Sequence, residues 1–80
     1  MTNDSIYERL GRVFREHLHQ PTLQIVPRMT QDDIPGWDST AMASIIVAIE
    51  EEFGFEFSSD ELRSVRSVGD LAHIVAQHPE

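Results

Sequence analysis

The chain has 80 residues, a formal net charge of −8 and no cysteine, which limits it to one small domain over residues 1–80, with no disulfide framework and no thiol of its own. The acidic balance disfavours nucleic acid as a partner, because phosphate binding requires a basic surface, and it favours a basic protein surface instead. The longest apolar run, residues 45–49, is too short to cross a membrane, and the N-terminus lacks the features of a signal peptide, so we expect a cytoplasmic protein with no membrane contact.

Residues 4–18 are predicted to form the first helix, because apolar side chains recur on one arc at helical spacing. The arc consists of Ile6, Leu10, Val13, Phe14 and Leu18. Asp4 or Ser5 is the expected N-cap, and Pro21 is expected to end the helix. His17 falls inside the apolar arc and is expected to be partly buried and hydrogen-bonded. The four histidines of the chain show no spacing typical of metal ligands, so no metal site is predicted.

A long connection follows over residues 20–38, where three prolines and Gly36 oppose a continuous helix. It also contains more apolar residues than a disordered linker would: Leu23, Ile25, Val26, Met29, Ile34 and Trp37. We therefore expect an ordered loop that folds back over the helices.

The second helix is predicted over residues 39–53, which contain no glycine or proline. Its apolar face consists of Met42, Ile45, Ile46, Ile49 and Phe53. Asp38 is the expected N-cap and Gly54 the expected residue just after the helix. Ser39 should therefore lie in the first turn of a helix, directly after a long loop.

Two further helix starts are indicated by capping boxes, one formed by Ser58 with Glu61 and the other by Ser67 with Asp70. The first predicts a short helix of one or two turns that includes Leu62. The second predicts a last helix from residue 68 to about residue 77. This last helix should bury Val68, Leu71, Ile74 and Val75. Between the second and third helices, Phe55 and Phe57 alternate with Glu56, which hints at a short extended segment. The expected fold is all-α, with three main helices, one short helix and no convincing sheet.

The acidity is concentrated in residues 32–62, which contain no basic residue. Ser39 could be a nucleophile, but a serine hydrolase needs a base within hydrogen-bond reach and an oxyanion hole. Asp38 is the sequence neighbour of Ser39 and points elsewhere, and the motif is not the Gly-x-Ser-x-Gly elbow of hydrolases. We therefore expect no independent catalysis and no catalytic residue.

Three stretches resemble the acyl carrier protein family: Gly36-Trp37-Asp38-Ser39-Thr40, the segment Ile45-Ile46-Val47-Ala48-Ile49-Glu50-Glu51-Glu52-Phe53-Gly54, and Val68-Gly69-Asp70-Leu71. The resemblance covers nearly the whole chain and implies a four-helix bundle of the acyl carrier protein type. It implies that Ser39, flanked by Asp38, carries 4′-phosphopantetheine from coenzyme A. The thiol of this arm would hold an acyl or aminoacyl group as a thioester.

The same resemblance implies a monomer with three kinds of partner: a phosphopantetheinyl transferase, a ligase or transferase that loads the cargo, and a downstream acceptor enzyme. The family commonly has Leu after the serine, where this chain has Thr40, and acidic residues in the first half of the second helix, where this chain has Ala41 and Ser44. The expected docking surface consists of Trp37, Thr40, Ala43, Ser44, Val47, Glu50 and Glu51.

Because the part of this surface nearest Ser39 is neutral, we expect a dedicated enzyme of a specialised pathway as the main partner, and not the general fatty-acid machinery. Whether the cargo is a fatty acyl chain, a polyketide or an amino acid stays open. Two other classes of function remain as alternatives: an unmodified interaction module with the same fold, in which Ser39 is only a helix cap, and a small esterase-like enzyme.

Overall fold

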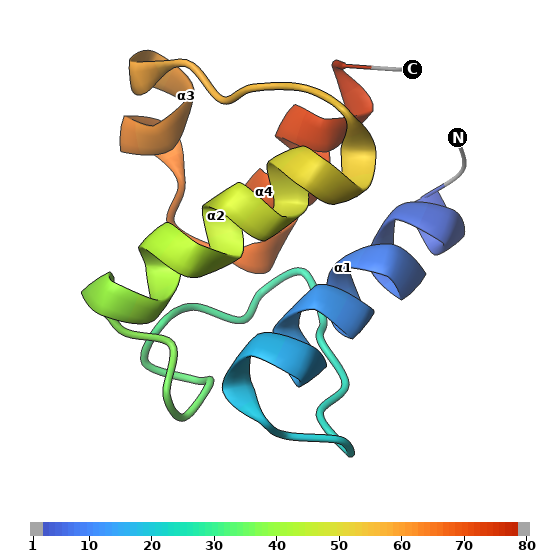
Figure 1. The fold of residues 1–80 in the computed structure, drawn as a ribbon, viewed down its shortest axis with the longest axis vertical. Coiled ribbons are helices and arrows are strands. Elements are labelled where there is room, and N and C mark those ends of the chain that lie inside the picture. Colours follow the sequence, from blue (N-terminus) through green and yellow to red (C-terminus); the bar gives the residue numbers. More distant parts are fainter. Residues whose placement is uncertain (1–2, 79–80) are drawn as a thin grey trace.

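The computed structural model describes residues 3–78 and consists of four helices joined by loops (Figure 1). These are α1 (Asn3–Leu18), α2 (Ser39–Phe53), α3 (Ser59–Ser64) and α4 (Val68–Ala76). Within residues 3–78 there is no strand, and the β-type pairing is confined to an isolated bridge between Thr30 and Ser67. The predicted all-α fold with three main helices and one short helix is confirmed. In the same residues, no helix has both the length and the apolar character required to cross a membrane.

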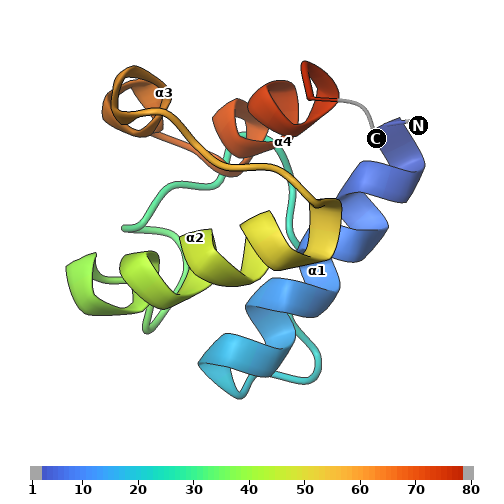
Figure 2. The same ribbon diagram turned by 45° about the horizontal axis from the view of Figure 1, so that its top comes forward.

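The helices enclose one apolar core, and α1 packs against both α2 and α4 (Figure 2). The core of the described residues consists of Ile6, Leu10, Val13, Phe14, Ile34, Trp37, Ile45, Ile46, Ile49, Phe53, Phe57, Val68, Leu71, Ala72, Ile74 and Val75. No polar or charged side chain is buried in this set. The apolar arcs predicted for the first, second and last helices therefore face the core, except that Leu18 and Met42 are only half-buried.

The start of α1 corrects the predicted cap. The helix already includes Asn3, so Asp4 and Ser5 lie within its first turn and neither is the N-cap. At the other end, α1 stops at Leu18, and His19 adopts a left-handed conformation with φ of 54°. The predicted stop near Pro21 is thus confirmed.

The connection between α1 and α2 is ordered and folded back over the helices, as predicted. Ile34 and Trp37 are buried in the core. The loop is also tied to the start of α4, because the Val68 N–H donates to the Met29 carbonyl at 2.9 Å and the Gly69 N–H donates to the Pro27 carbonyl at 2.9 Å. These contacts hold the middle of the long loop against the start of α4.

The predicted caps of the later helices are all present. Gly54 has φ of 76° after α2, a left-handed conformation that favours glycine. Ser58 with Glu61 and Ser67 with Asp70 form the two capping boxes. The short helix α3 nevertheless buries no residue, and its Leu62 is 38% exposed.

The segment between α2 and α3 forms no strand, in agreement with the expected absence of a convincing sheet. Phe57 is buried and Phe55 is half-buried, and their rings pack at 4.8 Å. Phe55 also stacks on His78 at 4.6 Å. His78 in turn contacts the Glu61 carboxylate at 2.7 Å, so the end of the described chain is held against α3. The pKa of Glu61 lies below its ordinary value. The main cause is the hydrogen bond from the Ser58 backbone N–H, and the second is the contact with His78.

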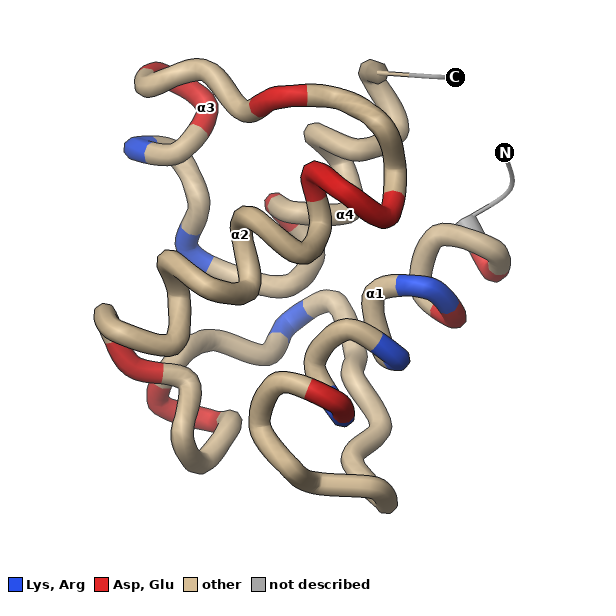
Figure 3. Tube along the Cα trace, viewed as in Figure 1, with Lys and Arg blue, Asp and Glu red and all other residues tan. Residues whose placement is uncertain are grey.

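A cluster of charges joins α1 to the end of α2 (Figure 3). The Glu52 carboxylate accepts hydrogen bonds from Arg9 Nε at 2.7 Å and from an Arg12 guanidinium nitrogen at 2.9 Å. The Arg9 guanidinium also lies 4.4 Å from the centre of the Phe53 ring. The pKa of Glu52 lies below its ordinary value of 4.5, mainly because its carboxylate accepts the hydrogen bond from Arg9. Glu52, one of the acids of residues 32–62, is therefore paired with two arginines of α1.

Glu52 should make the stability of the fold depend on pH. Its pKa is lower in the folded than in the unfolded chain, so its contribution is complete well above pH 4.5 and is lost as the pH falls through the folded-state value. Glu52→Gln should lower the free energy of unfolding at pH 7 by about 1 kcal/mol, the upper range for an exposed pair. Urea titrations at pH 7 and at acid pH measure this, with the exposed Glu51→Gln as control. An equal loss at both pH values would contradict the assignment.

Candidate functional site

Ser39 is the first residue of α2, and its side chain is exposed to solvent. The residue before it, Asp38, is the N-cap: its carboxylate accepts a hydrogen bond from the Ala41 N–H at 2.8 Å. The Asp38 carbonyl accepts a second bond, from the Met42 N–H at 2.8 Å. The Asp38 carboxylate therefore caps the helix backbone, as predicted, and leaves the Ser39 hydroxyl at the surface of a well-defined helix start.

Trp37 fixes the chain immediately before this start. Its indole is 2% exposed and packs edge-on against Phe14, with ring centres 5.0 Å apart. The indole Nε1–H donates to the Met42 Sδ at 3.1 Å. Gly36, with φ of 86°, makes the turn that directs the indole inward. Trp37 was predicted to belong to the docking surface, and this prediction is wrong, because the large apolar ring fills the space between loop and helices.

The solvent side of α2 brings together five of the predicted docking residues: Thr40, Ala43, Ser44, Val47 and Glu51. Val47 is 51% exposed, an unusually open position for an apolar side chain here. From residue 39 to residue 49 the helix has no charged residue, so the stripe next to Ser39 is neutral, as the sequence indicated (Figure 3). This neutral surface begins at the candidate attachment residue and runs along the helix.

Glu50 has a different place from the one predicted. It is half-buried, and its carboxylate accepts a hydrogen bond from the Phe57 N–H at 2.8 Å. This contact ties the loop after α2 back to the helix. The carboxylate of Glu50 is therefore committed inside the fold, and Glu51 is left as the exposed acid of the predicted docking set.

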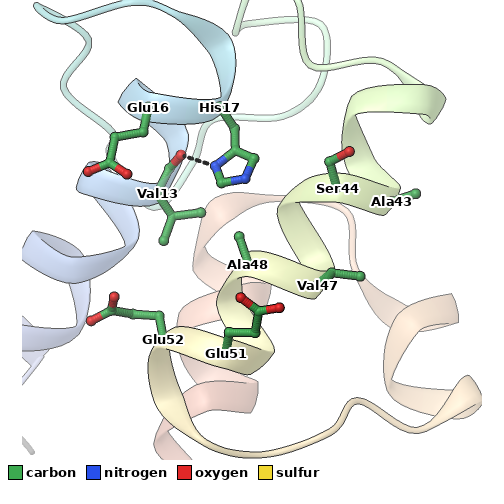
Figure 4. Close-up of a pocket in the computed structure, with 9 residues that line it drawn as sticks. All are labelled: Val13, Glu16, His17, Ala43, Ser44, Val47, Ala48, Glu51 and Glu52. Atoms are coloured by element: carbon green, nitrogen blue, oxygen red, sulfur yellow. Dashed lines mark hydrogen bonds between the residues drawn. The ribbon is translucent and has the colours of Figure 1, made fainter.

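A groove between α1 and α2 adds residues that the sequence did not suggest for the site (Figure 4). It is lined by Val13, Glu16, His17, Ala43, Ser44, Val47, Ala48, Glu51 and Glu52. His17 is exposed, which corrects the predicted partial burial, but it is hydrogen-bonded as expected, since its Nδ1 lies 3.1 Å from the Val13 carbonyl oxygen. Periodicity placed His17 on the apolar arc of α1, but only the crossing of α1 and α2 shows that this end of the arc opens onto a groove.

Metal binding is not supported by the arrangement of the possible ligands. Among residues 3–78, no group of three or more histidine, aspartate or glutamate side chains could hold a metal ion. Three of the acids near α2, Asp38, Glu50 and Glu52, are instead engaged in the contacts already given.

Comparison with protein families gives a match to the model described as "Phosphopantetheine attachment site" over residues 8–75 of the chain. This segment includes Ser39, the whole of α2 and most of α1 and α4.

Comparison with individual proteins gives relatives of similar length. The chain is 38% identical over 72 residues to "Acyl carrier protein MbtL" of Mycolicibacterium paratuberculosis, covering 90% of this chain and 80% of that protein. It is 29% identical over 76 residues to the "Acyl carrier protein" of Acidothermus cellulolyticus, covering 95% and 90%. Among solved structures, the holo acyl carrier protein of Geobacter metallireducens matches with a TM-score of 0.84 at 28% identity, covering 90% of this chain and 83% of that one.

Proposed function

Because this chain belongs to the acyl carrier protein family, we propose that Ser39 is the residue that carries its 4′-phosphopantetheine. Proteins of this family are carriers and not enzymes, and the cofactor is bound covalently. The observation that carries the proposal is the position of Ser39, which is exposed at the first turn of α2 while Trp37 and Asp38 hold the chain on its N-terminal side.

The start of α2 fits a phosphodiester on Ser39. The N-terminus of a helix is the positive end of its macrodipole, and it favours a negative charge on the first residues. The Asp38 carboxylate is held by the Ala41 N–H. On the exposed side the next residues are small or short, Thr40 and Ala43, so no large side chain covers the hydroxyl. Once bound, the cofactor supplies a terminal thiol that forms thioesters.

In the attachment reaction, the Ser39 oxygen forms a bond to the phosphorus of coenzyme A that bears the pantetheine. The bond from this phosphorus to the bridging oxygen of the pyrophosphate breaks, and adenosine 3′,5′-bisphosphate leaves with that oxygen. The hydroxyl proton passes to a base of the phosphopantetheinyl transferase. Ser39 therefore needs only to be reachable and well positioned, since the transferase activates it.

The proposal has a direct chemical test. Incubation of the purified chain with coenzyme A and a broad-specificity phosphopantetheinyl transferase should raise its mass by one phosphopantetheine group, measured by intact-protein mass spectrometry. A mass that stays unchanged with several transferases would contradict the proposal and favour the unmodified interaction module.

We further propose that the main partners are dedicated enzymes in the cytoplasm: a ligase or transferase that loads a specialised acyl or aminoacyl group, and an acceptor that removes it. The support is the neutral stripe of α2, on which Val47 is 51% exposed and the charged Glu51 lies farther from Ser39. Exposed charge pairs contribute little each and are screened by salt. A partner that covers Val47 would instead gain from apolar burial, at about 25 cal/mol per Å².

Substitutions at Val47 and Glu51 should separate apolar from charged docking. Val47→Glu should weaken binding to the loading enzyme by at least about tenfold, or roughly 1.4 kcal/mol, because a carboxylate would be buried against an apolar contact. Glu51→Gln should weaken it by no more than about threefold, because one exposed charge pair contributes little. Isothermal titration calorimetry at low and moderate salt measures both effects, and salt should weaken wild-type binding only moderately. Efficient exchange with general fatty-acid enzymes, together with a collapse of binding in salt or on loss of Glu51, would contradict the proposal.

A further inference from the structure

Two hollows between α1 and α2 adjoin and form one groove that begins beside Ser39. The first, shown in Figure 4, holds ≈ 670 Å³, which is within the range of small-ligand sites. The second hollow is lined by His17, Leu18, His19, Gly36, Asp38, Thr40, Ala41 and Ser44. The two share His17 and Ser44, and the second one reaches both sequence neighbours of Ser39. We call the two together the α1–α2 groove.

The length of this groove matches a phosphopantetheine arm. Along α2 it runs from Thr40 to Glu52, about 18 Å at a rise of 1.5 Å per residue. An extended arm has about as many backbone bonds as four to five residues, which gives a similar reach of about 16 Å. An arm attached to Ser39 could therefore lie along the groove and end near its far rim.

The chemistry of the walls also matches the arm. A carbonyl oxygen can only accept, so the 3.1 Å contact with Val13 makes His17 Nδ1 the donor. In the neutral ring this leaves Nε2 as an acceptor, and Figure 4 shows the ring extending from α1 toward α2. Ser44 contributes a hydroxyl, and Val13 and Ala48 contribute methyl groups between the two helices, whereas the Ala43 methyl group points away from α1 (Figure 4). The arm beyond its phosphate is uncharged and offers two amide N–H groups, a hydroxyl and a dimethyl carbon.

The acids of the groove do not oppose this occupant. Glu51 and Glu52 lie at the end of the groove farthest along α2 from Ser39, and Glu52 is already paired with Arg9 and Arg12. The Glu16 carboxylate points away from α2 (Figure 4), and the Asp38 carboxylate accepts the Ala41 N–H. The negative phosphate would stay at the start of the helix, where the helix dipole favours it.

We propose that in the resting carrier the phosphopantetheine arm lies in the α1–α2 groove, with His17 Nε2 accepting a hydrogen bond from an amide of the arm and the dimethyl carbon against Val13 and Ala48. The proposal rests on attachment at Ser39. It gives α1 a role in holding the cofactor, in addition to its role in the core.

The test compares the apo and holo forms of the whole chain by NMR, after mass spectrometry has shown that one phosphopantetheine group is present. The holo form should show shifted signals for the His17 ring and the Ser44 amide, and nuclear Overhauser effects from the methyl groups of the arm to Val13 and Ala48. Ser44→Gln places a longer side chain in the groove and should abolish these contacts, measured on protein whose single phosphopantetheine group has been verified by mass. Ser59→Gln makes the same change at an exposed residue of α3 outside the groove and should preserve them.

The outcomes distinguish the two proposals. A chain that gains the expected mass, but whose shifts are confined to Ser39 and its sequence neighbours, overturns the groove proposal and leaves the attachment intact. Contacts that survive unchanged in Ser44→Gln overturn it as well. A chain that gains no mass with any transferase overturns the attachment, and the groove proposal with it.

Discussion

Ser39→Ala should abolish the mass gain with coenzyme A completely, because alanine has no oxygen to bond to phosphorus. The fold should be unchanged. The start of α2 is capped by the Asp38 carboxylate and carbonyl, and not by the Ser39 side chain. Alanine is also the best helix former, so the substitution at an exposed first-turn position introduces no strain. Intact-protein mass spectrometry measures the modification, and circular dichroism with a thermal scan checks the fold.

Two neighbouring hydroxyls provide the matched controls for this assignment. Thr40→Ala and Ser44→Ala each remove an exposed hydroxyl from the same face of α2 and should leave the mass gain intact. A mass gain that persists in Ser39→Ala but disappears in one of these variants would move the attachment to that residue. If all three variants are folded and none gains mass, the transferase recognises the surface of α2 as a whole. That result would contradict the assignment of the attachment to Ser39 by this test.

Ile49→Ala should be the most destabilising of the substitutions considered. Ile49 lies in the second half of α2, on its buried face, and is 0% exposed. Removing most of a fully buried side chain costs the transfer free energy of the lost groups plus the free energy of the cavity, roughly 2–5 kcal/mol. A domain has only about 5–15 kcal/mol of total stability. The variant should therefore unfold at much lower urea than the wild type and be largely unfolded near body temperature.

Val47→Ala is the matched control on the same helix. Val47 is two residues away and 51% exposed, so its truncation leaves no cavity and should change the free energy of unfolding by no more than about 0.5 kcal/mol. Urea titration followed by circular dichroism measures both variants. A loss below about 0.5 kcal/mol for Ile49→Ala, or a larger loss for Val47→Ala, would show that the buried face of α2 is assigned wrongly.

The sequence by itself determined the features that depend on neighbouring residues. The three N-caps at Asp38, Ser58 and Ser67 each bond to a backbone N–H three residues later, so their geometry is local and readable from spacing. The buried face of α2 follows from its 3.6-residue period for the same reason. The cap at Asp38 and the period of α2 together place Ser39 at an exposed helix start. The resemblance to acyl carrier proteins rests on the same residues.

Only the tertiary structure decided which of the long side chains near Ser39 are buried, which are bonded within the fold and which are exposed. Trp37 follows a flexible glycine, so its direction depended on the space beside Phe14. The sequence shows Glu50, Glu51 and Glu52 as one acidic run, yet the packing separates them. Glu50 bonds to the Phe57 N–H, Glu52 pairs with Arg9 and Arg12, and Glu51 stays exposed.

The α1–α2 groove is the clearest example of this limit. Its two walls, around His17 and Ser44, are far apart in the sequence and meet only because α1 crosses α2. Helical periodicity gives the face of each residue on its own helix, but not where two helices diverge and leave part of an apolar face open. The attachment serine is therefore predictable from local chemistry, whereas the surroundings of the arm depend on contacts between distant segments.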